Sequence, residues 1–350
     1  MKALKLYGIR DIRFDEASEE PQIKNGSDVK IRIKAAGICG SDISRYAKLG
    51  PYVPGMIWGH EFAGEVVEVG SEVDRFKAGD RVTVSPAMTC RTCESCRAGK
   101  PAQCEHLEVL GAKEPGAFAE YIVVPAAHVV DIPDGVSFEA AAMTEPSAVV
   151  AHGFYKTPLQ PGDSVAVLGC GTIGLLAVQW AKIFGAEKVI ALDIDDEKLA
   201  LAKSIGADET INSMGVEPYE KVLEVTNGHG VTLSVESAGT PITSAQAFSL
   251  PGKGGSVLYL GIPYGDVMVK RLYFEKIVRN ELKVFGSWNA VSAPYPGKEW
   301  TSTLYFMQAG KLQTAPLITH RASFAEGPRM FEMTAERKES FGKIMFLPEA

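Results

Sequence analysis

The chain has 350 residues, of which 46% are hydrophobic and 23% charged, and its net charge is −7. This length suits two domains, and the composition is ordinary for a globular protein. Nucleic-acid binding is not expected, because phosphate neutralisation needs clustered cations and this acidic chain has no basic run. The sequence has neither a signal-peptide pattern nor an apolar run of roughly 20 residues, so we expect a cytoplasmic protein outside the membrane.

Short β-type runs separated by glycine and proline dominate the first part of the chain, up to about residue 155. These runs cover residues 29–40, 61–70, 80–86 and 119–133. Their spacing predicts a compact antiparallel β domain with few helices.

From Ser164 onward, apolar strand-like runs alternate with helix-like stretches. This alternation predicts a parallel sheet with helices on both faces, and therefore an α/β domain. After Phe285 the sequence returns to proline, glycine and aromatic residues, then ends in the β-type run 343–348. We expect this tail to rejoin the first domain. The predicted domains are therefore residues 1–155 with 287–350, and residues 156–286.

A glycine fingerprint opens the second domain between a predicted strand and a predicted helix. Its three glycines have the spacing G-x-G-x-x-G, and the predicted cofactor-contacting residues are Gly169, Gly171, Thr172, Ile173 and Gly174. The first glycine permits the tight turn, the second lets a pyrophosphate approach the backbone, and the third lets the helix pack against the strand. The helix N-terminus then offers free N–H groups to the phosphates.

Asp193 ends the next predicted strand, where a carboxylate would accept hydrogen bonds from the adenosine ribose. A carboxylate there repels a 2′-phosphate, and no arginine follows closely. The sequence therefore predicts a dinucleotide site that prefers NAD to NADP.

Four of the six cysteines are clustered as C-x2-C-x2-C-x7-C: Cys90, Cys93, Cys96 and Cys104. Four thiolates at this spacing can surround one Zn²⁺ tetrahedrally and leave no open position, which predicts a structural zinc site. Iron–sulfur ligation also uses closely spaced cysteines and is the alternative.

A second metal site is predicted from residues that are far apart in the sequence. Cys39 lies in GICGSD, His60 and Glu61 lie in GHEFAG, and Glu145 lies among small apolar residues. An ionised carboxylate in apolar surroundings is costly unless a cation is near. One cysteine, one histidine and one carboxylate with a water make an open, catalytic type of zinc site.

These motifs together resemble the zinc-dependent medium-chain alcohol and polyol dehydrogenase family. The resemblance rests on CGSD, the run 59–82 (GHEFAGEVVEVGSEVDRFKAGDRV), the four-cysteine segment, TEP and the glycine fingerprint, in this order. It implies a GroES-like catalytic domain followed by a Rossmann domain, with the substrate on zinc between them. It also implies two zinc ions and NAD for each chain, and a homodimer or homotetramer.

The resemblance assigns roles residue by residue. Cys39 and His60 match two catalytic zinc ligands, and Glu145 stands where the alcohol branch has a cysteine, as in the polyol branch. Glu61 or Glu145 is then the third ligand, and both stay candidates. Asp42 matches an acid that orients the histidine.

The proton route follows from the same resemblance. Ser41 matches the hydroxyl that takes the substrate proton. Three residues later, where alcohol dehydrogenases often have a relay histidine, this chain has Ser44. We therefore expect the proton to leave through water near Glu145.

The tail stretches 285–300 and 315–324 resemble members of the family that act on sugar-alcohol phosphates. They imply oxidation of galactitol 1-phosphate to tagatose 6-phosphate, with Arg45 and Lys48 as phosphate-binding candidates and Lys298 and Arg321 as further ones. Alternatives are a sorbitol- or xylitol-type polyol, threonine or a simple alcohol as substrate. A different class of function, a non-catalytic nucleotide-binding protein, is disfavoured by the metal-binding residues.

Overall fold

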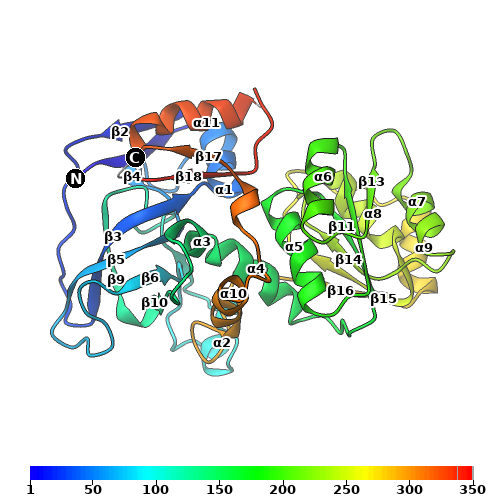
Figure 1. The fold of residues 1–350 in the computed structure, drawn as a ribbon, viewed down its shortest axis with the longest axis horizontal. Helices are drawn as coiled ribbons and strands as arrows, with labels where there is room; N and C mark the ends of the chain where they lie inside the picture. The colour runs from blue at the N-terminus through cyan, green and yellow to red at the C-terminus, as the bar shows by residue number, and fades with distance from the viewer. Residues whose placement is uncertain (337, 349–350) are drawn as a thin grey trace. The chain divides into compact units, whose positions relative to one another are not determined.

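The computed structural model describes residues 1–336 and 338–348, and the chain forms two compact units (Figure 1). Unit 1 comprises Met1–Pro146, Ala290–Gly310 and Thr314–Ala350, and unit 2 comprises Ser147–Asn289 and Lys311–Gln313. Each unit is described by itself below.

Antiparallel β-sheets dominate unit 1. A seven-stranded sheet has the order β10-β6-β5-β3-β18-β17, with β9 also paired to β3, and smaller sheets have the orders β2-β1-β4 and β7-β8. The strands are β1 Ala3–Gly8, β2 Asp11–Asp15, β3 Asp28–Gly37, β4 Met56–Ile57, β5 Glu61–Val69, β6 Arg81–Val84, β7 Ala87–Met88, β8 Glu108–Val109, β9 Tyr121–Pro125, β10 Val129–Asp131, β17 Ile318–Ala322 and β18 Lys343–Phe346.

Helices of unit 1 are short and lie between or beside these strands. They are α1 Gly40–Ser44, the π-helix η1 Arg45–Leu49, α2 Glu94–Arg97, η2 Pro101–Gln103, η3 Ala126–His128, α3 Phe138–Ala142, α10 Lys298–Gln308, η5 Ala315–Leu317, η6 Phe324–Glu326 and α11 Gly327–Glu336. The C-terminal strand β18 pairs with β3, so the end of the chain lies beside the N-terminal strands (Figure 1). Phe118, Phe331 and Phe346 pack edge to face in the core beneath them.

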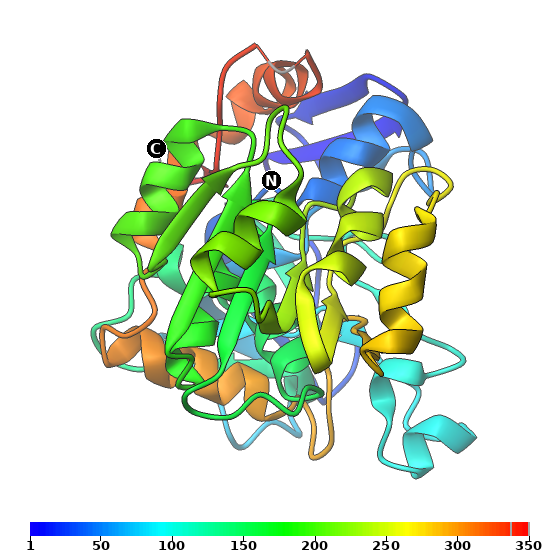
Figure 2. The same cartoon turned by 90° about the vertical axis from the view of Figure 1, so that its right-hand side faces the viewer.

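Unit 2 is a six-stranded parallel sheet of order β13-β12-β11-β14-β15-β16, with helices flanking it (Figure 2). Its central strands β11 and β12 are buried along most of their length, because helices cover both faces. The elements are β11 Ser164–Leu168, α5 Thr172–Ile183, β12 Lys188–Asp193, α6 Asp196–Ser204, β13 Glu209–Asn212, α7 Pro218–Val225, β14 Val231–Glu236, α8 Pro241–Gln246, η4 Ala247–Ser249, β15 Pro251–Tyr259, α9 Arg271–Arg279 and β16 Lys283–Gly286. The order of strands reverses between β11 and β14, which is the arrangement of a Rossmann fold.

The border between the units differs in detail from the predicted one. It falls inside α4 Thr144–Phe154, whereas the sequence placed it at residues 155–156, and the second border lies at Asn289 instead of residue 286. Residues 311–313 belong to unit 2 because Gln313 exchanges two hydrogen bonds with Gln179 of α5, at 2.9 and 2.6 Å.

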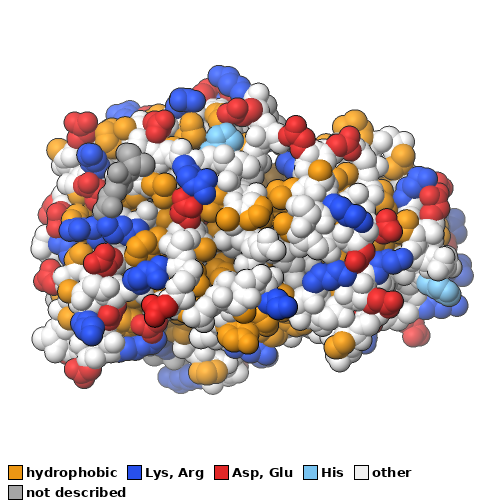
Figure 3. All heavy atoms as spheres, viewed as in Figure 1, with side chains coloured by type: hydrophobic (Ala, Val, Ile, Leu, Met, Phe, Trp, Pro, Cys, Tyr) orange, Lys and Arg blue, Asp and Glu red, His pale blue; other side chains and the backbone are white. Residues whose placement is uncertain are grey.

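The surface agrees with the charge pattern of the sequence. On the face shown in Figure 3, basic and acidic side chains are interspersed, with no large cluster of one sign. Along the described parts of the chain, no helix combines the length and apolarity that spanning a bilayer requires.

Candidate metal centres and nucleotide site

Strand pairing in unit 1 brings the first two predicted zinc ligands together. Strand β3 ends at Gly37, which pairs with Glu61, the first residue of β5. Cys39 follows two residues after β3 as the N-cap of α1, and His60 precedes β5. Residues from two separate motifs therefore meet at one end of the sheet.

The ligand atoms of Cys39, His60 and Glu61 all lie within 4.8 Å of one another. Glu61 is buried and His60 is mostly so, with 13% of its side chain exposed. Sulfur, imidazole nitrogen and carboxylate oxygen are the donors that zinc uses in open sites. The donor set therefore fits a zinc ion with a position left for water or substrate.

Asp42 is a buried carboxyl group that lies next to the His60 ring. Its Oδ2 accepts a hydrogen bond from the backbone N–H of Cys39 at 2.9 Å, and its Oδ1 lies 3.7 Å from His60 Nδ1. Oδ1 is buried without a hydrogen bond to any described residue, and burial raises the pKa of the carboxyl group. A histidine that binds a metal through one nitrogen donates the other N–H to such a group. The position of Asp42 therefore also fits the predicted metal.

Sequence reasoning missed Lys343, the first residue of β18. Its Nζ donates to Glu61 Oε2 and, at 2.9 Å, to the carbonyl oxygen of Ile38. Burial opposes the charged form, but Glu61, Cys39 and Glu145 together outweigh it and the pKa of Lys343 is raised. A lysine at the start of the otherwise apolar run KIMF was the available signal, since a charge in a buried strand needs a partner.

Glu145 lies near this cluster, in the first turn of α4. Burial raises its pKa to about 7, and the charges of His60, Glu61 and Lys343 also act on it. The cluster thus places the carboxyl groups of Asp42, Glu61 and Glu145 and the thiol of Cys39 around two basic groups, the imidazole of His60 and the ammonium of Lys343. Buried anions need compensation, so this balance of charge fits a divalent cation.

The four-cysteine segment forms a second possible metal site. The ligand atoms of Cys90, Cys93, Cys96 and Cys104 lie within 4.8 Å of one another. The sulfur of Cys104 is 3.5 Å from that of Cys90 and 4.0 Å from that of Cys93. Four thiolates at about 2.3 Å from one zinc ion would lie about 3.8 Å apart, so the spacing fits.

Backbone N–H groups donate hydrogen bonds to two of these sulfurs. The N–H of Cys93 donates to Cys90 Sγ at 3.3 Å, and that of Cys90 donates to Cys104 Sγ at 3.4 Å. N–H groups of Thr92 and Cys93 lower the pKa of Cys90 to about 5. A closed shell of four sulfurs leaves no place for substrate.

The fingerprint glycines of unit 2 have the geometry expected of a dinucleotide turn. Gly169 has φ of 92°, and a Cβ on Gly174 would lie 1.7 Å from the carbonyl oxygen of Gly169. Gly171 is the N-cap of α5, and space is open where its Cβ would be. Thr172 and Ile173 form the first turn of that helix. The backbone can therefore receive a pyrophosphate at the start of α5.

Asp193 lies at the end of β12, next to this turn. Its Oδ2 accepts a hydrogen bond from Cys170 N at 2.6 Å, while its Oδ1 accepts from Ile194 N at 2.7 Å and Asp195 N at 3.1 Å. The carboxylate is thereby fixed between the glycine turn and the start of α6. The predicted ribose contact of Asp193 stays a prediction.

Comparison with known proteins identifies both units. The Alcohol dehydrogenase GroES-like domain family matches residues 25–134, and the Zinc-binding dehydrogenase family matches residues 172–304. Galactitol 1-phosphate 5-dehydrogenase of Escherichia coli K12 is 38% identical over 330 residues, 94% of each chain. Sorbitol dehydrogenase of Bacillus subtilis is 35% identical over 99% of this chain and 97% of its own. The crystal structure of galactitol-1-phosphate dehydrogenase from E. coli matches with a TM-score of 0.94 and 37% identity, over 99% of this chain and all of the other.

The chain belongs to the zinc-dependent medium-chain alcohol and polyol dehydrogenase family. The predicted fold class, a GroES-like domain with a Rossmann domain, is confirmed, and so is the prediction of an enzyme. Zinc and NAD are the cofactors of this family, as predicted, and the alternative of a non-catalytic nucleotide-binding protein is set aside.

The predicted proton-transfer residues of the dehydrogenase lie on α1. Ser41 is exposed in the first turn of that helix, two residues after Cys39. Ser44 donates its hydroxyl to the carbonyl oxygen of Gly40 at 2.9 Å. Because this bond holds the Ser44 hydroxyl against its own helix, Ser44 does not supply an obvious replacement for a relay histidine.

The phosphate-binding candidates of the dehydrogenase differ in their surroundings. Arg45 and Lys48 lie on η1, and the guanidinium of Arg45 stacks 3.7 Å from the centroid of the Tyr52 ring. Arg321 makes a bidentate ion pair with Glu139, at 2.6 and 2.9 Å, so its charge is already compensated.

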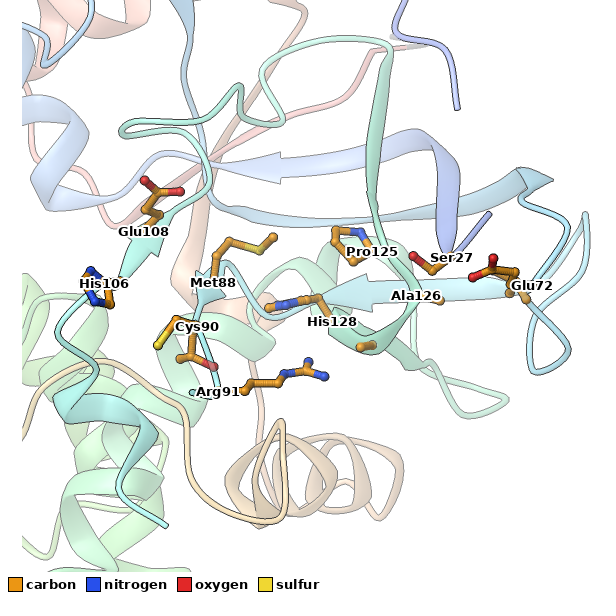
Figure 4. A pocket seen from close by; sticks show the side chains of 13 residues that line it. Ser27, Glu72, Met88, Cys90, Arg91, His106, Glu108, Pro125, Ala126 and His128 are labelled. Atoms are coloured by element: carbon orange, nitrogen blue, oxygen red, sulfur yellow. The ribbon is translucent and has the colours of Figure 1, made fainter. Parts of the chain in front are cut away.

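A cavity of about 650 Å³ occupies another part of unit 1 (Figure 4). It lies between the four-cysteine segment and η3, and its charged lining includes Glu72, Arg91 and Glu108. Of the predicted site residues it contains only Cys90, so it is separate from the Cys39–His60 cluster.

Proposed function

We propose that the enzyme oxidises a secondary hydroxyl of galactitol 1-phosphate, giving tagatose 6-phosphate, while NAD is reduced. The observation that carries the polyol assignment is the metal cluster, in which the carboxylate of Glu61, and no second cysteine of the described residues, accompanies Cys39 and His60. The 38% identity to the E. coli galactitol 1-phosphate enzyme supports the choice of substrate.

In this proposal Cys39, His60 and Glu61 hold the catalytic zinc. When bound there, zinc would supply the Lewis acidity that eases loss of the hydroxyl proton, and NAD would supply the acceptor for the hydride. Glu145 is close enough to the cluster to hold a water or a neighbouring hydroxyl of the polyol. Asp42 orients the His60 ring in this proposal, since its Oδ1 lies 3.7 Å from Nδ1 and has no hydrogen bond to a described residue.

Ser41 takes the proton of the reacting hydroxyl. Since Ser44 is bonded to Gly40 O, the proton leaves through water held by Glu145 and not along α1. A carboxyl group with a pKa of about 7 can both accept and release a proton near neutral pH.

Arg45 and Lys48 bind the phosphate of the substrate. Both lie on the π-helix that directly follows α1, and π-helical turns often occur at functional sites. The Tyr52 ring under Arg45 fixes the plane of the guanidinium, which suits bidentate contact with a phosphate.

A polyol without phosphate is the second candidate substrate, because sorbitol dehydrogenase of B. subtilis is 35% identical over 99% of the chain. Threonine is a third candidate, since an L-threonine 3-dehydrogenase is 33% identical over 93% of the chain. A simple alcohol remains the least favoured, because the cluster is rich in carboxylates.

The test is NADH formation with galactitol 1-phosphate, sorbitol, xylitol, threonine and ethanol, each with and without a zinc chelator. We expect the highest kcat/KM for galactitol 1-phosphate and loss of activity with the chelator. Preference for sorbitol or threonine would move the assignment to those substrates, and no turnover of any polyol would refute it.

The phosphate assignment is tested separately with Arg45→Ala. We expect KM for galactitol 1-phosphate to rise about tenfold while KM for galactitol is unchanged, because only the former offers a phosphate. Arg321→Ala is the matched control, since Arg321 is paired with Glu139. An equal rise for both substrates would remove the phosphate role.

We further propose that the enzyme is a homodimer joined through unit 2. β16 is the last strand of the six-stranded sheet, and its outer edge pairs with no strand of the described residues. Val284 on this strand, Phe274 and Val278 on α9, and Trp288 each expose half or more of their surface. A bare strand edge beside exposed apolar side chains is typical of an interface.

A further inference from the structure

Glu236 is a buried acid that the functional assignment so far leaves unused. It is the last residue of β14, and it lies opposite Leu168 of β11 in the parallel sheet. This is the carboxyl edge of the two strands between which the strand order reverses. In open α/β sheets, ligands bind at that point. Glu236 has none of its surface exposed.

One carboxyl oxygen of Glu236 holds the turn that follows β14. Oε1 accepts hydrogen bonds from Ala238 N at 3.0 Å, Gly239 N at 2.9 Å and the Thr243 hydroxyl at 2.7 Å. These donors lie in the turn and in the first part of α8. A single acceptor therefore fixes the turn and the beginning of the next helix together.

The neighbouring groups extend this connection to two further segments. The backbone carbonyl of Glu236 accepts hydrogen bonds from Leu260 N at 2.9 Å and Gly261 N at 3.1 Å, just after β15. The Ser237 hydroxyl lies 2.9 Å from the carbonyl oxygen of Leu168 and 3.0 Å from that of Gly169. Glu236 and Ser237 thus link three segments at the carboxyl edge, including the glycine turn.

The second carboxyl oxygen is enclosed by backbone. Oε2 is buried without a hydrogen bond to any residue that the structure describes, and a Cβ on Gly261 would lie 2.5 Å from it. A side chain this enclosed packs against the segment after β15 and limits its movement. Tyr259 is the titratable side chain on the adjoining strand, and its phenol donates to the carbonyl oxygen of Ser244 and not to Glu236.

We propose that Glu236, together with Ser237, is a positioning residue of the cofactor site, which fixes segments 237–240 and 260–262 relative to the glycine turn. These segments form the rim on the β14 side of the glycine turn, so their spacing sets the width available to the dinucleotide. The inference concerns the cofactor and holds whichever alcohol is oxidised.

The experiment measures the dissociation constant of NADH for the intact, zinc-loaded enzyme, by calorimetry and without any alcohol. We expect Glu236→Ala to raise it at least tenfold and Ser237→Ala about threefold, because each change frees part of the rim. Glu236→Gln keeps the acceptor and the volume, so its dissociation constant should stay within about threefold of wild type.

Ser234→Ala is the matched control for Ser237→Ala. Ser234 is also buried on β14, and its hydroxyl also donates to a carbonyl oxygen, that of Ala247 at 2.8 Å. The Ser234 hydroxyl makes no such hydrogen bond to segment 237–240, segment 260–262 or the glycine turn. Ser234→Ala should therefore lose stability and keep its affinity for NADH.

The pH dependence of stability checks the environment of the Glu236 carboxyl group independently of the NADH measurements, which alone decide the positioning role. Burial raises the pKa of Glu236 above its ordinary value of 4.5, so the ionised form is disfavoured in the folded enzyme. Wild type should therefore lose stability relative to Glu236→Gln as the pH rises through that raised pKa.

Two results would overturn the inference. The first is a dissociation constant within threefold of wild type for Glu236→Ala. The second is an equal loss of NADH affinity in Ser234→Ala and Ser237→Ala, which would assign the effect to general destabilisation. If Glu236→Ala does not fold, Ser237→Ala and Ser234→Ala still decide the question.

Discussion

Among single residues, the buried acids around Cys39 are those whose substitution should have the largest effects. The reason is that a buried carboxylate stays ionised only if a cation lies close to it. Glu61 has Lys343 as a partner, and its ligand oxygen is also within reach of a metal. Glu145 lies near the same charges, outside the group whose ligand atoms lie within 4.8 Å. The geometry therefore favours Glu61 as the third zinc ligand.

We predict that Glu61→Gln lowers the zinc content from about two ions per chain to about one, because the open site loses an anionic ligand. Glu145→Gln should keep both ions. Inductively coupled plasma mass spectrometry of the purified variants measures this.

The double variant Glu61→Gln/Lys343→Met is the control, since Glu61→Gln alone leaves the Lys343 ammonium buried without its carboxylate. Loss of the ion in Glu145→Gln, with retention in Glu61→Gln, would make Glu145 the ligand instead.

A second residue-scale prediction concerns the choice of cofactor. Asp193→Ala should lower the ratio of kcat/KM for NAD to that for NADP by at least about tenfold, because the carboxylate no longer repels a 2′-phosphate. Steady-state kinetics with both cofactors measure the ratio.

Asp195→Ala serves as the control for Asp193→Ala. Asp195 caps α6, accepting from Glu197 N at 2.9 Å, so its loss should cost about 1 kcal/mol of stability and leave the cofactor preference intact. An unchanged ratio in Asp193→Ala would show that Asp193 does not contact the adenosine ribose.

At the scale of elements, the segment that bears the four cysteines depends on metal for its shape. Its regular structure amounts to the short helices α2 and η2, and of its four cysteines only Cys104 is buried. Metal–ligand bonds replace a hydrophobic core in such segments. Structure in this segment and catalysis at Cys39 should therefore be separable.

We predict that Cys93→Ser releases one zinc ion per chain and increases hydrogen exchange in residues 89–104, with kcat of the folded enzyme within about twofold of wild type. Hydrogen-exchange mass spectrometry and metal analysis test this. Cys170→Ala removes a buried thiol from unit 2 and should change neither quantity. A large fall in kcat with unchanged exchange would mean that the segment takes part in catalysis.

At the scale of the whole molecule, the proposed homodimer depends on the outer edge of strand β16. Val284→Lys on β16 places a charge at the edge of the sheet, and charges on edge strands oppose pairing. We expect the wild type to sediment as a dimer at micromolar concentration, and the variant to weaken the dimer at least about hundredfold.

Tyr305→Lys is the control for the dimer prediction, because Tyr305 is an exposed aromatic residue on α10 of unit 1. Sedimentation velocity over a range of concentrations separates the two variants. A monomeric wild type, or dimers that survive Val284→Lys and fall apart in Tyr305→Lys, would refute this interface.

The sequence by itself determined the features whose chemistry depends on local spacing. The cysteine cluster, the fingerprint glycines and the alternation of strands and helices are patterns within short stretches of sequence. Such patterns can be recognised from residue spacing without knowledge of the tertiary structure. They were enough to predict the two-domain fold and the four-cysteine site, whereas Cys39, His60 and Glu61 lie far apart in the sequence and their roles as ligands came from the family resemblance.

Only the tertiary structure decided which distant residues meet. The pairing of β18 with β3 brings Lys343 from the last strand of the chain to Glu61. The order of β11, β14 and β15 in the sheet places Glu236 beside the end of β11, which leads into the glycine turn. No local pattern carries such information, because strand pairing is fixed by the packing of a whole core. The border between the units inside α4 could not be predicted for the same reason. Helix propensity indicates that residues form a helix, but not which hydrophobic core each turn of the helix packs against.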